Sequence, residues 1–234
     1  MAVQKDFSVD CVVFGYHEDE LKVLLIEQRM PETSAGKEKR YALPGDLVQD
    51  NEDLDDSASR VLKELTSVEL ENAYLKQFYT FGNPKRVKGL RDQQWLRSFR
   101  QDPDARVITV AYYSLVKMED YNPVAASFAS ETVWMNVDEV PALAFDHNTI
   151  FDKALATLRE KIKYYPIGFH LLPKKFTLSQ LQHLNEVISG EELDKRNFRR
   201  KVQKLPYIIP LEEKQKGVFH KPARLHVYDE RFKE

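Results

Sequence analysis

Acidic residues gather in one short segment of the chain, between a turn and the start of a helical pattern. Pro44 and Gly45 form the turn. The carboxylates that follow it are those of Asp50, Glu52, Asp53, Asp55 and Asp56. Mg²⁺ prefers carboxylate oxygens, provided that several reach the ion at short, near-octahedral distances. The segment is therefore the first place in this chain to look for metal-dependent chemistry.

The spacing of the residues after this cluster predicts an amphipathic helix. Apolar side chains recur at i, i+4, i+7, i+8 and i+11 and form one stripe, made of Leu54, Ala58, Val61, Leu62 and Leu65. A second face carries Asp56, Arg60 and Glu64, which are four residues apart and therefore spaced for ion pairing. We expect the first face to pack on a core and the second to hold charged groups.

The segment from Leu43 to Val68 resembles the Nudix box. That motif has a glycine, five residues, a glutamate, seven residues, and then Arg-Glu-hydrophobic-x-Glu-Glu-x-Gly-hydrophobic. With Asp46 in the place of the first glycine, the residues in register are Glu52, Arg60, Leu62, Glu64 and Val68. The resemblance implies a loop and helix built to handle phosphate and metal.

The departures from the box remove most of its metal ligands. Val61 and Leu65 replace two of the three clustered glutamates, and Ser67 replaces a glycine. Because valine and leucine supply no oxygen ligand, we expect no metal, no cofactor and no catalytic residue here. The alternative is a hydrolase of nucleoside-diphosphate-linked substrates, in which Glu64 and the acidic cluster assemble a displaced metal site.

The composition predicts a folded chain of two units with opposite charge. An apolar content of 42% over 234 residues is ample for real cores, and the length exceeds one average domain. From residue 171 onward there are 14 Lys and Arg against 9 Asp and Glu, a net charge of +5, whereas the rest carries −7. Proline and glycine residues near this change place the domains at 1–165 and 170–234. The basic unit is the candidate for binding a polyanion.

The single cysteine and the N-terminus predict an ordinary cytoplasmic protein. Cys11 lies in an apolar run and is expected to be a small buried hydrophobe. The N-terminus lacks the apolar core of a signal peptide, and no apolar run reaches membrane-spanning length. We therefore expect a reducing, cytoplasmic setting without membrane association.

The N-terminal unit is predicted to be α/β (α+β), a mixed β-sheet sandwiched by helices. Runs rich in β-branched and aromatic residues predict strands at 7–14, 22–27, 73–81, 107–116 and 132–137, and a helical period covers 150–162. Between residues 82 and 106 lies a long polar link, in which Trp95, Leu96 and Phe99 could form one helical turn. Its basic residues predict either an auxiliary contact surface or a solvated insertion. They are Lys85, Arg86, Lys88, Arg91, Arg97 and Arg100.

Two helices are predicted at the start of the basic unit. Thr177 and Gln180 form a capping box for the first helix, and Gly190 suits the position just past its end. Asp194 can cap a second helix over residues 195–204, which carries six basic and no acidic residues. Phe198, Val202 and Leu205 fall on the opposite, core-facing side of that helix. Two helices joined by a short turn, the second basic on its exposed face, predict a helix-turn-helix.

A strand, a basic turn and a second strand follow, and they predict a wing. The strands lie near residues 207–210 and 225–228, with Lys216, His220, Lys221 and Arg224 at or near the tip. The candidate DNA-binding residues are Lys195, Arg196, Asn197, Arg199, Arg200, Gln203, Lys216, Lys221 and Arg224. The alternative is that this basic face is merely solvated.

Motifs across nearly the whole chain resemble the Nudix-related transcriptional regulators, which include NAD-metabolism repressors and arabinose-responsive regulators. The sequence runs that carry the resemblance span residues 79–84, 106–112, 145–147, 171–173, 176–182, 194–201 and 221–225. The resemblance implies a homodimer with a C-terminal winged helix-turn-helix on each subunit. It also implies that a small metabolite in the Nudix-like domain changes the spacing of two recognition helices on a double-stranded DNA operator. The insertion at 85–105 departs from the family pattern.

The resemblance implies an effector pocket between the box and the sheet. The candidate residues are Arg40, Tyr41, Glu64, Arg106, Tyr112, Asp146 and His147. Each has a structural alternative: Glu64 could pair only with Arg60, and Asp146 could only cap the helix that begins with His147. The effector is expected to be a sugar, a sugar phosphate or a nucleotide sugar. The lost acidic cluster favours a simple sugar over a metal-chelated pyrophosphate.

Overall fold

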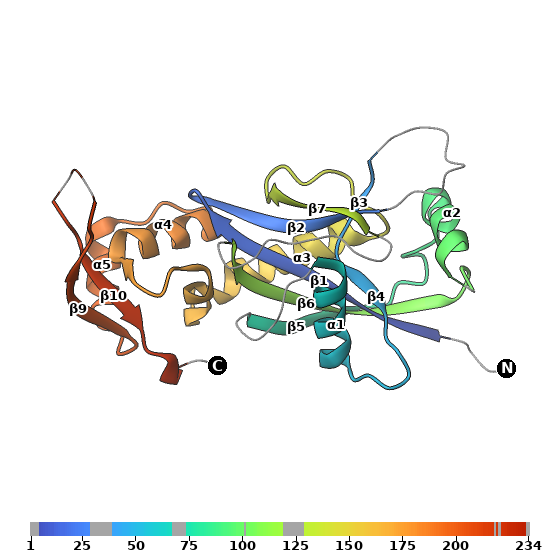
Figure 1. The fold of residues 1–234 in the computed structure, drawn as a ribbon, viewed down its shortest axis with the longest axis horizontal. Coiled ribbons are helices and arrows are strands. Elements are labelled where there is room, and N and C mark those ends of the chain that lie inside the picture. Colours follow the sequence, from blue (N-terminus) through green and yellow to red (C-terminus); the bar gives the residue numbers. More distant parts are fainter. Residues whose placement is uncertain are drawn as a thin grey trace.

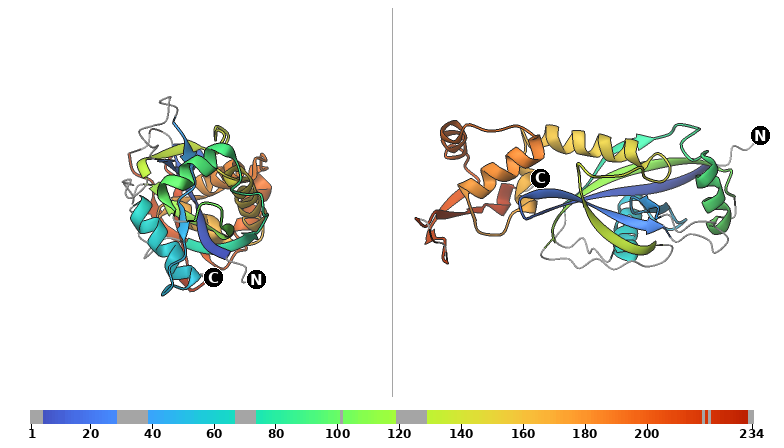
Figure 2. Two further views of the ribbon diagram at one scale, coloured as in Figure 1. Left: turned by 90° about the vertical axis from the view of Figure 1, so that its right-hand side faces the viewer. Right: turned by 90° about the horizontal axis from the view of Figure 1, so that it is seen from above.

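The protein is elongated, with a mixed β-sheet at one end and a small domain of helices and strands at the other (Figure 1; Figure 2). The structure is a computed structural model, and it describes residues 5–28, 39–66, 74–100, 102–118, 129–217, 219 and 221–232. Most of the polar loop at 31–40, the box residues Ser67 and Val68, and the wing residue His220 lie outside the described residues. Within the described part, no helix is long and apolar enough to cross a membrane.

The strand β1 is the centre of the larger sheet. It pairs in parallel with β6 and antiparallel with β2 and β4, while β5 pairs with β6, and β3 and β7 pair with β2. The bounds are β1 (Lys5–His17), β2 (Glu20–Gln28), β3 (Tyr41–Ala42), β4 (Gly45–Leu47), β5 (Tyr74–Phe81), β6 (Arg106–Lys117) and β7 (Ala129–Asn136). The predicted strands and the mixed sheet are therefore confirmed.

Two helices cover the opposite faces of this sheet because its strands alternate between two cores. In β1, Val9, Cys11 and Val13 pack with the helix α1 (Leu54–Thr66), whereas Val12 and Phe14 pack on the side of α3 (His147–Lys161). The predicted stripe of α1 is the face that packs, and Cys11 is fully buried, as expected. The sheet sandwiched by helices is thus confirmed.

The long polar link holds more structure than its sequence predicted. Instead of one helical turn, it forms the helix α2 (Leu90–Phe99), with Trp95 and Leu96 buried against Val87 and Val107. Figure 1 shows α2 at the end of the sheet farthest from the C-terminal domain. Neither alternative for the basic residues of the link holds for Arg86, because it is buried.

The C-terminal part forms a winged helix. Its elements are η3 (Pro166–Leu171), β8 (Phe176–Thr177), α4 (Leu178–Ser189), α5 (Lys195–Val202), β9 (Ile208–Lys214), β10 (Arg224–Tyr228) and η4 (Glu230–Phe232). The strand β8 was not predicted; it pairs with β10 beside β9. The capping box is confirmed, because Thr177 Oγ1 accepts from the Gln180 backbone N–H and Gln180 Oε1 accepts from the Thr177 N–H. Gly190 ends α4 with a φ of 71°, which favours glycine.

The two parts of the chain share one hydrophobic core. Leu158 in α3, Ile167 in η3, Phe176 in β8, Leu184 in α4 and Val202 in α5 belong to the same cluster as residues of β1 and β6. At the far end of α3, the Arg159 Nε donates to the Ile188 carbonyl of α4, at 3.0 Å. The winged helix is therefore packed onto α3 rather than tethered by a free linker.

Candidate functional site

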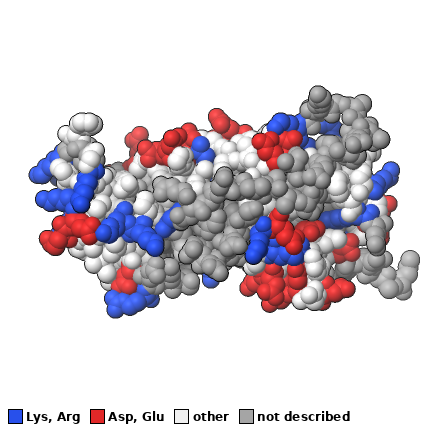
Figure 3. Space-filling view, viewed as in Figure 1, with Lys and Arg blue, Asp and Glu red and all other residues white. Residues whose placement is uncertain are grey.

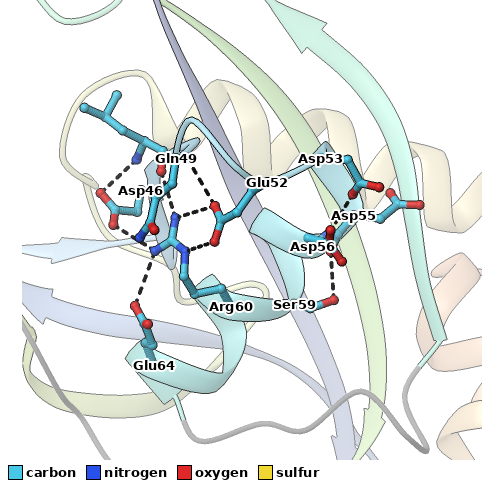
Figure 4. Close-up of polar contacts among 10 residues, drawn as sticks. Asp46, Gln49, Glu52, Asp53, Asp55, Asp56, Ser59, Arg60 and Glu64 are labelled. Carbon is cyan, nitrogen blue, oxygen red and sulfur yellow. Dashed lines mark hydrogen bonds and ion pairs between the residues drawn. The ribbon is translucent and has the colours of Figure 1, made fainter.

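Arg60 holds the loop of the Nudix-like box in place (Figure 4). Its guanidinium donates to both carboxylate oxygens of Glu52, to the Leu47 carbonyl at 2.8 Å and to Asp46 at 3.2 Å. It also pairs with Glu64 at 3.3 Å. The hydrogen bond from Arg60 is the main reason why the pKa of the Glu52 carboxyl lies below its ordinary value. Two carboxylates that the box would offer to a metal thus bind an arginine.

The two replaced glutamate positions belong to the core. Val61 and Leu65 are 0% and 2% exposed and pack against the sheet beneath α1. Among the described residues, no group of three His, Cys, Asp or Glu side chains converges as metal ligands would. The arrangement therefore keeps the loop of the box while offering apolar side chains at two of its metal-binding positions.

A cavity of about 110 Å³ lies beside the start of the box, between the ends of β1 and β2 and the helix α2. Its walls come from Ser8, Asp10, Ile26, Gln28, Ala42, Leu43, Gly45, Asp46, Leu47, Arg86, Val87, Trp95, Phe99, Arg100, Phe145 and His147. A Cβ at residue 45 would collide with the Asp10 carboxylate, so glycine is needed there. The cavity thus joins the box, the sheet and the insertion in one place.

A buried arginine forms the floor of this site. The Arg86 side chain is 3% exposed and donates to both oxygens of Asp146, at 2.9 and 3.0 Å, and to Asp10 at 3.2 Å. Charges this deep need partners, because a lone buried ion is costly to desolvate. Asp146 makes no side-chain cap to α3, so its carboxylate serves Arg86 instead of the helix. The cluster ties the insertion to β1 and to the start of α3.

His147 is held as a neutral imidazole beside this cluster. Its Nδ1 accepts from the Leu43 backbone N–H at 2.9 Å, which leaves the ring proton on Nε2, 3.6 Å from Asp10 Oδ1. Burial lowers the pKa of His147 below its ordinary value, and the nearby carboxylates of Asp10 and Asp146 only partly oppose this effect. The histidine therefore orders the turn at Leu43 without carrying a charge at neutral pH.

A second arginine fastens α2 over the cavity. Arg40 forms an ion pair with Asp92 of α2, and its guanidinium lies 5.5 Å from the centre of the Phe145 ring. Asp92 also accepts from the Phe145 backbone N–H at 3.0 Å. Phe145 itself has a φ of 56°, an uncommon value outside glycine, and this conformation aims its backbone at α2. The wall of the cavity is therefore built by contacts between segments far apart in sequence.

The structure separates the seven candidate effector residues. Only His147 lines the cavity, and Asp146 reaches it through Arg86. Arg40 braces α2, and Glu64 pairs with Arg60. The remaining three lie elsewhere: Tyr41 in β3 accepts from the Ala144 N–H through its carbonyl, Arg106 donates to the Gly82 carbonyl, and Tyr112 donates to Asp55.

Sequence reasoning missed most of the cavity walls. Asp10, Gln28, Arg86 and Arg100 come from two strands and from the insertion. Arg86 and Arg100 were visible only as part of a basic run, and nothing in that run distinguished them from solvated residues. A buried polar residue in an apolar strand, such as Asp10, is the one signal that could have pointed here.

The second candidate site is the exposed face of α5. Lys195, Arg196, Asn197, Arg199, Arg200 and Gln203 are all exposed, whereas Val202 is buried and Phe198 and Leu205 pack against the core, as predicted. Asp194 caps the helix through the Asn197 N–H at 2.8 Å. Figure 3 shows Lys and Arg side chains at the end of the molecule formed by α5 and the wing, with a smaller group of acidic side chains beside them, and further acidic side chains near α1.

The wing adds further cations beside α5. A groove of about 490 Å³ is lined by Arg199 and Gln203 of the helix and by Lys221 and Arg224 of the wing. Lys216 is exposed on the turn. Arg224 is held by its own hairpin, because it donates to the Leu211 carbonyl and to Glu212 at 2.6 Å. The arrangement is a basic ridge beside a groove, suited to a phosphate backbone.

A Nudix-like sheet joined to a winged helix with a basic second helix is the architecture in which this chain resembles the Nudix-related transcriptional regulators. Residues 168–228 match the family model for the NrtR DNA-binding winged helix domain. The chain is 27% identical over 221 residues to the "ADPR responsive transcriptional repressor NtrR" of Acinetobacter baylyi, covering 94% of this chain and 80% of the relative.

Solved structures of NrtR from Shewanella oneidensis are similar to this chain. The complex with a 27mer DNA superposes with a TM-score of 0.73 at 28% identity, covering 95% of this chain and 93% of the other. The Nudix domain of the same protein in complex with ADP ribose gives a TM-score of 0.50 at 27% identity, covering 68% and 90%. The resemblance to Nudix-related transcriptional regulators and the predicted fold class are both confirmed.

Replacing Arg86 by methionine should lower the free energy of unfolding by roughly 3 kcal/mol, because Asp10 and Asp146 would be left as buried charges without their partner. Urea unfolding followed by circular dichroism measures this loss. The control is Lys88→Met, which breaks an exposed pair with Asp104 and should cost less than about 1 kcal/mol. Equal losses in the two variants would contradict the assigned role of Arg86.

Acid should destabilise the protein partly through His147. Because the pKa of His147 is lowered in the folded state, the unfolded chain binds a proton at this histidine at a higher pH than the folded chain does. The contribution of His147 to the free energy of unfolding is therefore fully present above about pH 6.5 and is lost as the pH falls below that value. His147→Gln keeps an acceptor for the Leu43 N–H but cannot titrate. Thermal unfolding between pH 7.5 and 5 should therefore show a smaller loss of Tm in this variant than in the wild type. An unchanged pH slope would rule out the buried neutral histidine.

Proposed function

We propose that this protein is a DNA-binding transcriptional regulator whose Nudix-like domain binds an effector of the ADP-ribose type without hydrolysing it. The observation that carries the proposal is the exposed basic face of α5, within a stretch that matches the NrtR DNA-binding winged helix model. A relative described as responsive to ADPR and a similar Nudix domain bound to ADP ribose support the class of effector.

This effector class replaces the simple sugar that the sequence favoured. The loss of acidic residues argues against metal-assisted hydrolysis, because those residues would bind the metal. The same loss does not argue against binding of a diphosphate, because arginine side chains can contact its oxygens directly. The cavity has such a side chain on its wall in Arg100, whereas Arg86 is already paired with Asp10 and Asp146. A phosphorylated ribose derivative therefore fits the site better than an uncharged sugar.

The proposed domain boundaries separate effector binding from DNA binding. We assign residues 1–165 to effector binding and 170–234 to DNA binding, and η3 (Pro166–Leu171) spans the boundary between them. Affinity for DNA would rest mainly on phosphate contacts of the α5 cations, with Lys216, Lys221 and Arg224 of the wing beside them. A homodimer on a pseudo-palindromic operator would hold its two recognition helices about 34 Å apart.

Two elements connect the cavity with the winged helix. The hairpin of β1 and β2 lines the cavity at one end, and at its turn Asp19 lies 3.6 Å from His183 of α4. The helix α3 begins at Asp146, which binds Arg86, and Arg159 near its other end binds α4. A ligand that moves Arg86 or the strand ends would thereby bias the placement of α4 and α5.

Removing the cations of α5 should weaken DNA binding and its salt dependence. In a mobility-shift assay on the protein's own upstream region, Arg199→Ala plus Arg200→Ala should lower affinity at least about tenfold, and the slope of log K against log salt should lose about 1.8. The control, Lys85→Ala plus Arg97→Ala, removes two exposed charges from the insertion. A loss of the same size in both variants would place the contact outside α5 and contradict the proposal.

Binding without turnover is the expected behaviour towards ADP-ribose. Calorimetry should show binding in the absence of metal, and chromatography should show no release of AMP above background with Mg²⁺ or Mn²⁺, because Glu52 and Glu64 are bound to Arg60. The rival function, a hydrolase, predicts metal-dependent release. Turnover that Glu64→Gln abolishes would establish the rival and overturn the regulator that only binds.

A further inference from the structure

One buried amide in the cavity lacks a partner. Gln28, the last residue of β2, is 3% exposed and lines the cavity, and its Oε1 accepts no hydrogen bond within the described part of the chain. A buried polar group without a partner costs about 1–3 kcal/mol, so its presence needs a reason. A ligand that donates a hydrogen bond at this point supplies one.

One cation on the same wall is also unpaired. Arg100 follows the last residue of α2, and its backbone N–H donates the last hydrogen bond of the helix to the Leu96 carbonyl, at 2.7 Å. Its guanidinium forms no hydrogen bond or ion pair with any residue that the structure describes. Burial lowers the pKa of Arg100 from its ordinary value, although the carboxylates of Asp10, Asp6 and Asp46 oppose this effect. The guanidinium is therefore partly desolvated without a counter-ion of its own.

Two of the three acidic residues whose charges act on Arg100 are already bound to other arginines, and the third, Asp6, forms no ion pair with Arg100. Asp10 accepts from Arg86, and Asp46 accepts from Arg60. Among the described residues that line the cavity, Arg100 is thus the arginine left for an incoming anion. Guanidinium groups bind phosphate oxygens through two parallel hydrogen bonds, which gives both affinity and orientation.

Aromatic rings stand next to Arg100. Phe99 is 42% exposed and stacks on Trp95, with ring centres 4.5 Å apart. Both rings line the cavity. A flat sugar or base can pack against such a surface, while the polar groups fix its orientation. The wall built by the insertion therefore combines an anion contact with an apolar one.

We propose that Arg100 and Gln28 contact the effector directly: Arg100 binds a phosphate group, and Gln28 accepts a hydrogen bond from a hydroxyl or amino group of the attached sugar or base. The insertion at 85–105 then serves to bring Arg100 to the cavity. At about 110 Å³, the cavity takes only one end of an ADP-ribose-sized molecule, since such ligands fill 300 Å³ or more. This inference rests on the proposed function, because it names contacts within the same effector site.

Calorimetry with three probes tests the assignment: ADP-ribose, ribose 5-phosphate and adenosine. Arg100→Gln should weaken ADP-ribose and ribose 5-phosphate at least about tenfold and leave any binding of adenosine unchanged, because a charge-assisted hydrogen bond is worth roughly 1.5–3 kcal/mol. Arg100→Lys, which keeps the charge but loses the fork, should lie between that variant and the wild type. The matched control is Arg97→Gln, an exposed arginine of α2.

Gln28→Leu separates ligand binding from folding. Because the Gln28 Oε1 accepts no hydrogen bond from any residue that the structure describes, this variant should keep or raise the free energy of unfolding while weakening the binding of ADP-ribose about fivefold or more. Its control is Gln94→Leu on the exposed face of α2.

These measurements separate the assignment of Arg100 and Gln28 from the proposed class of effector. Wild-type affinity in folded Arg100→Gln and Gln28→Leu variants overturns the assignment of these residues and leaves the effector class standing. Failure of the wild-type protein to bind any of the three probes overturns the proposed effector class together with this inference.

Discussion

The ion pairs of Arg86 with Asp10 and Asp146 are the contact on which the rest of the site depends. They join three segments that the chain places far apart: the central strand β1, the insertion and the start of α3. Because a buried arginine is stable only with its partners in place, the insertion is fixed over the end of the sheet. The cavity, its aromatic wall and the position of Arg100 all follow from that anchoring.

The Nudix-like box acquires a different meaning in this setting. Its arginine, Arg60, binds Glu52, Asp46 and Glu64, so the carboxylates of the box shape a loop. Val61 and Leu65 extend the core beneath α1. Apolar side chains at these positions stabilise the domain by burial, but they supply none of the oxygen ligands that a metal would need. What began as a candidate for metal-dependent chemistry is better understood as one wall of a receptor.

Local patterns in the sequence were enough to predict the long strands and most of the helices, but not the short strands β3, β4 and β8, the full extent of α2, or the site. The stripe of α1, the capping box at Thr177 and the Asp194 cap are short-range signals, and each was confirmed. Gln28, Arg86 and Arg100 could not be found in this way, because their roles arise from contacts between distant segments. Arg86 lies 76 residues from Asp10 and 60 from Asp146. Charge alone made it look like the exposed lysines beside it.

We propose that the cavity and the DNA-binding face are coupled through α3 and the β1–β2 hairpin. Coupling between two binding sites is reciprocal: the factor by which ADP-ribose changes DNA affinity must equal the factor by which DNA changes ADP-ribose affinity. The most direct measurement is therefore the Kd of ADP-ribose for the free protein and for the protein saturated with its own upstream DNA. We predict that the two values differ by about 5-fold or more, matched by an equal change in DNA affinity with ADP-ribose present. Identical values, with both ligands bound at once, would contradict the coupling.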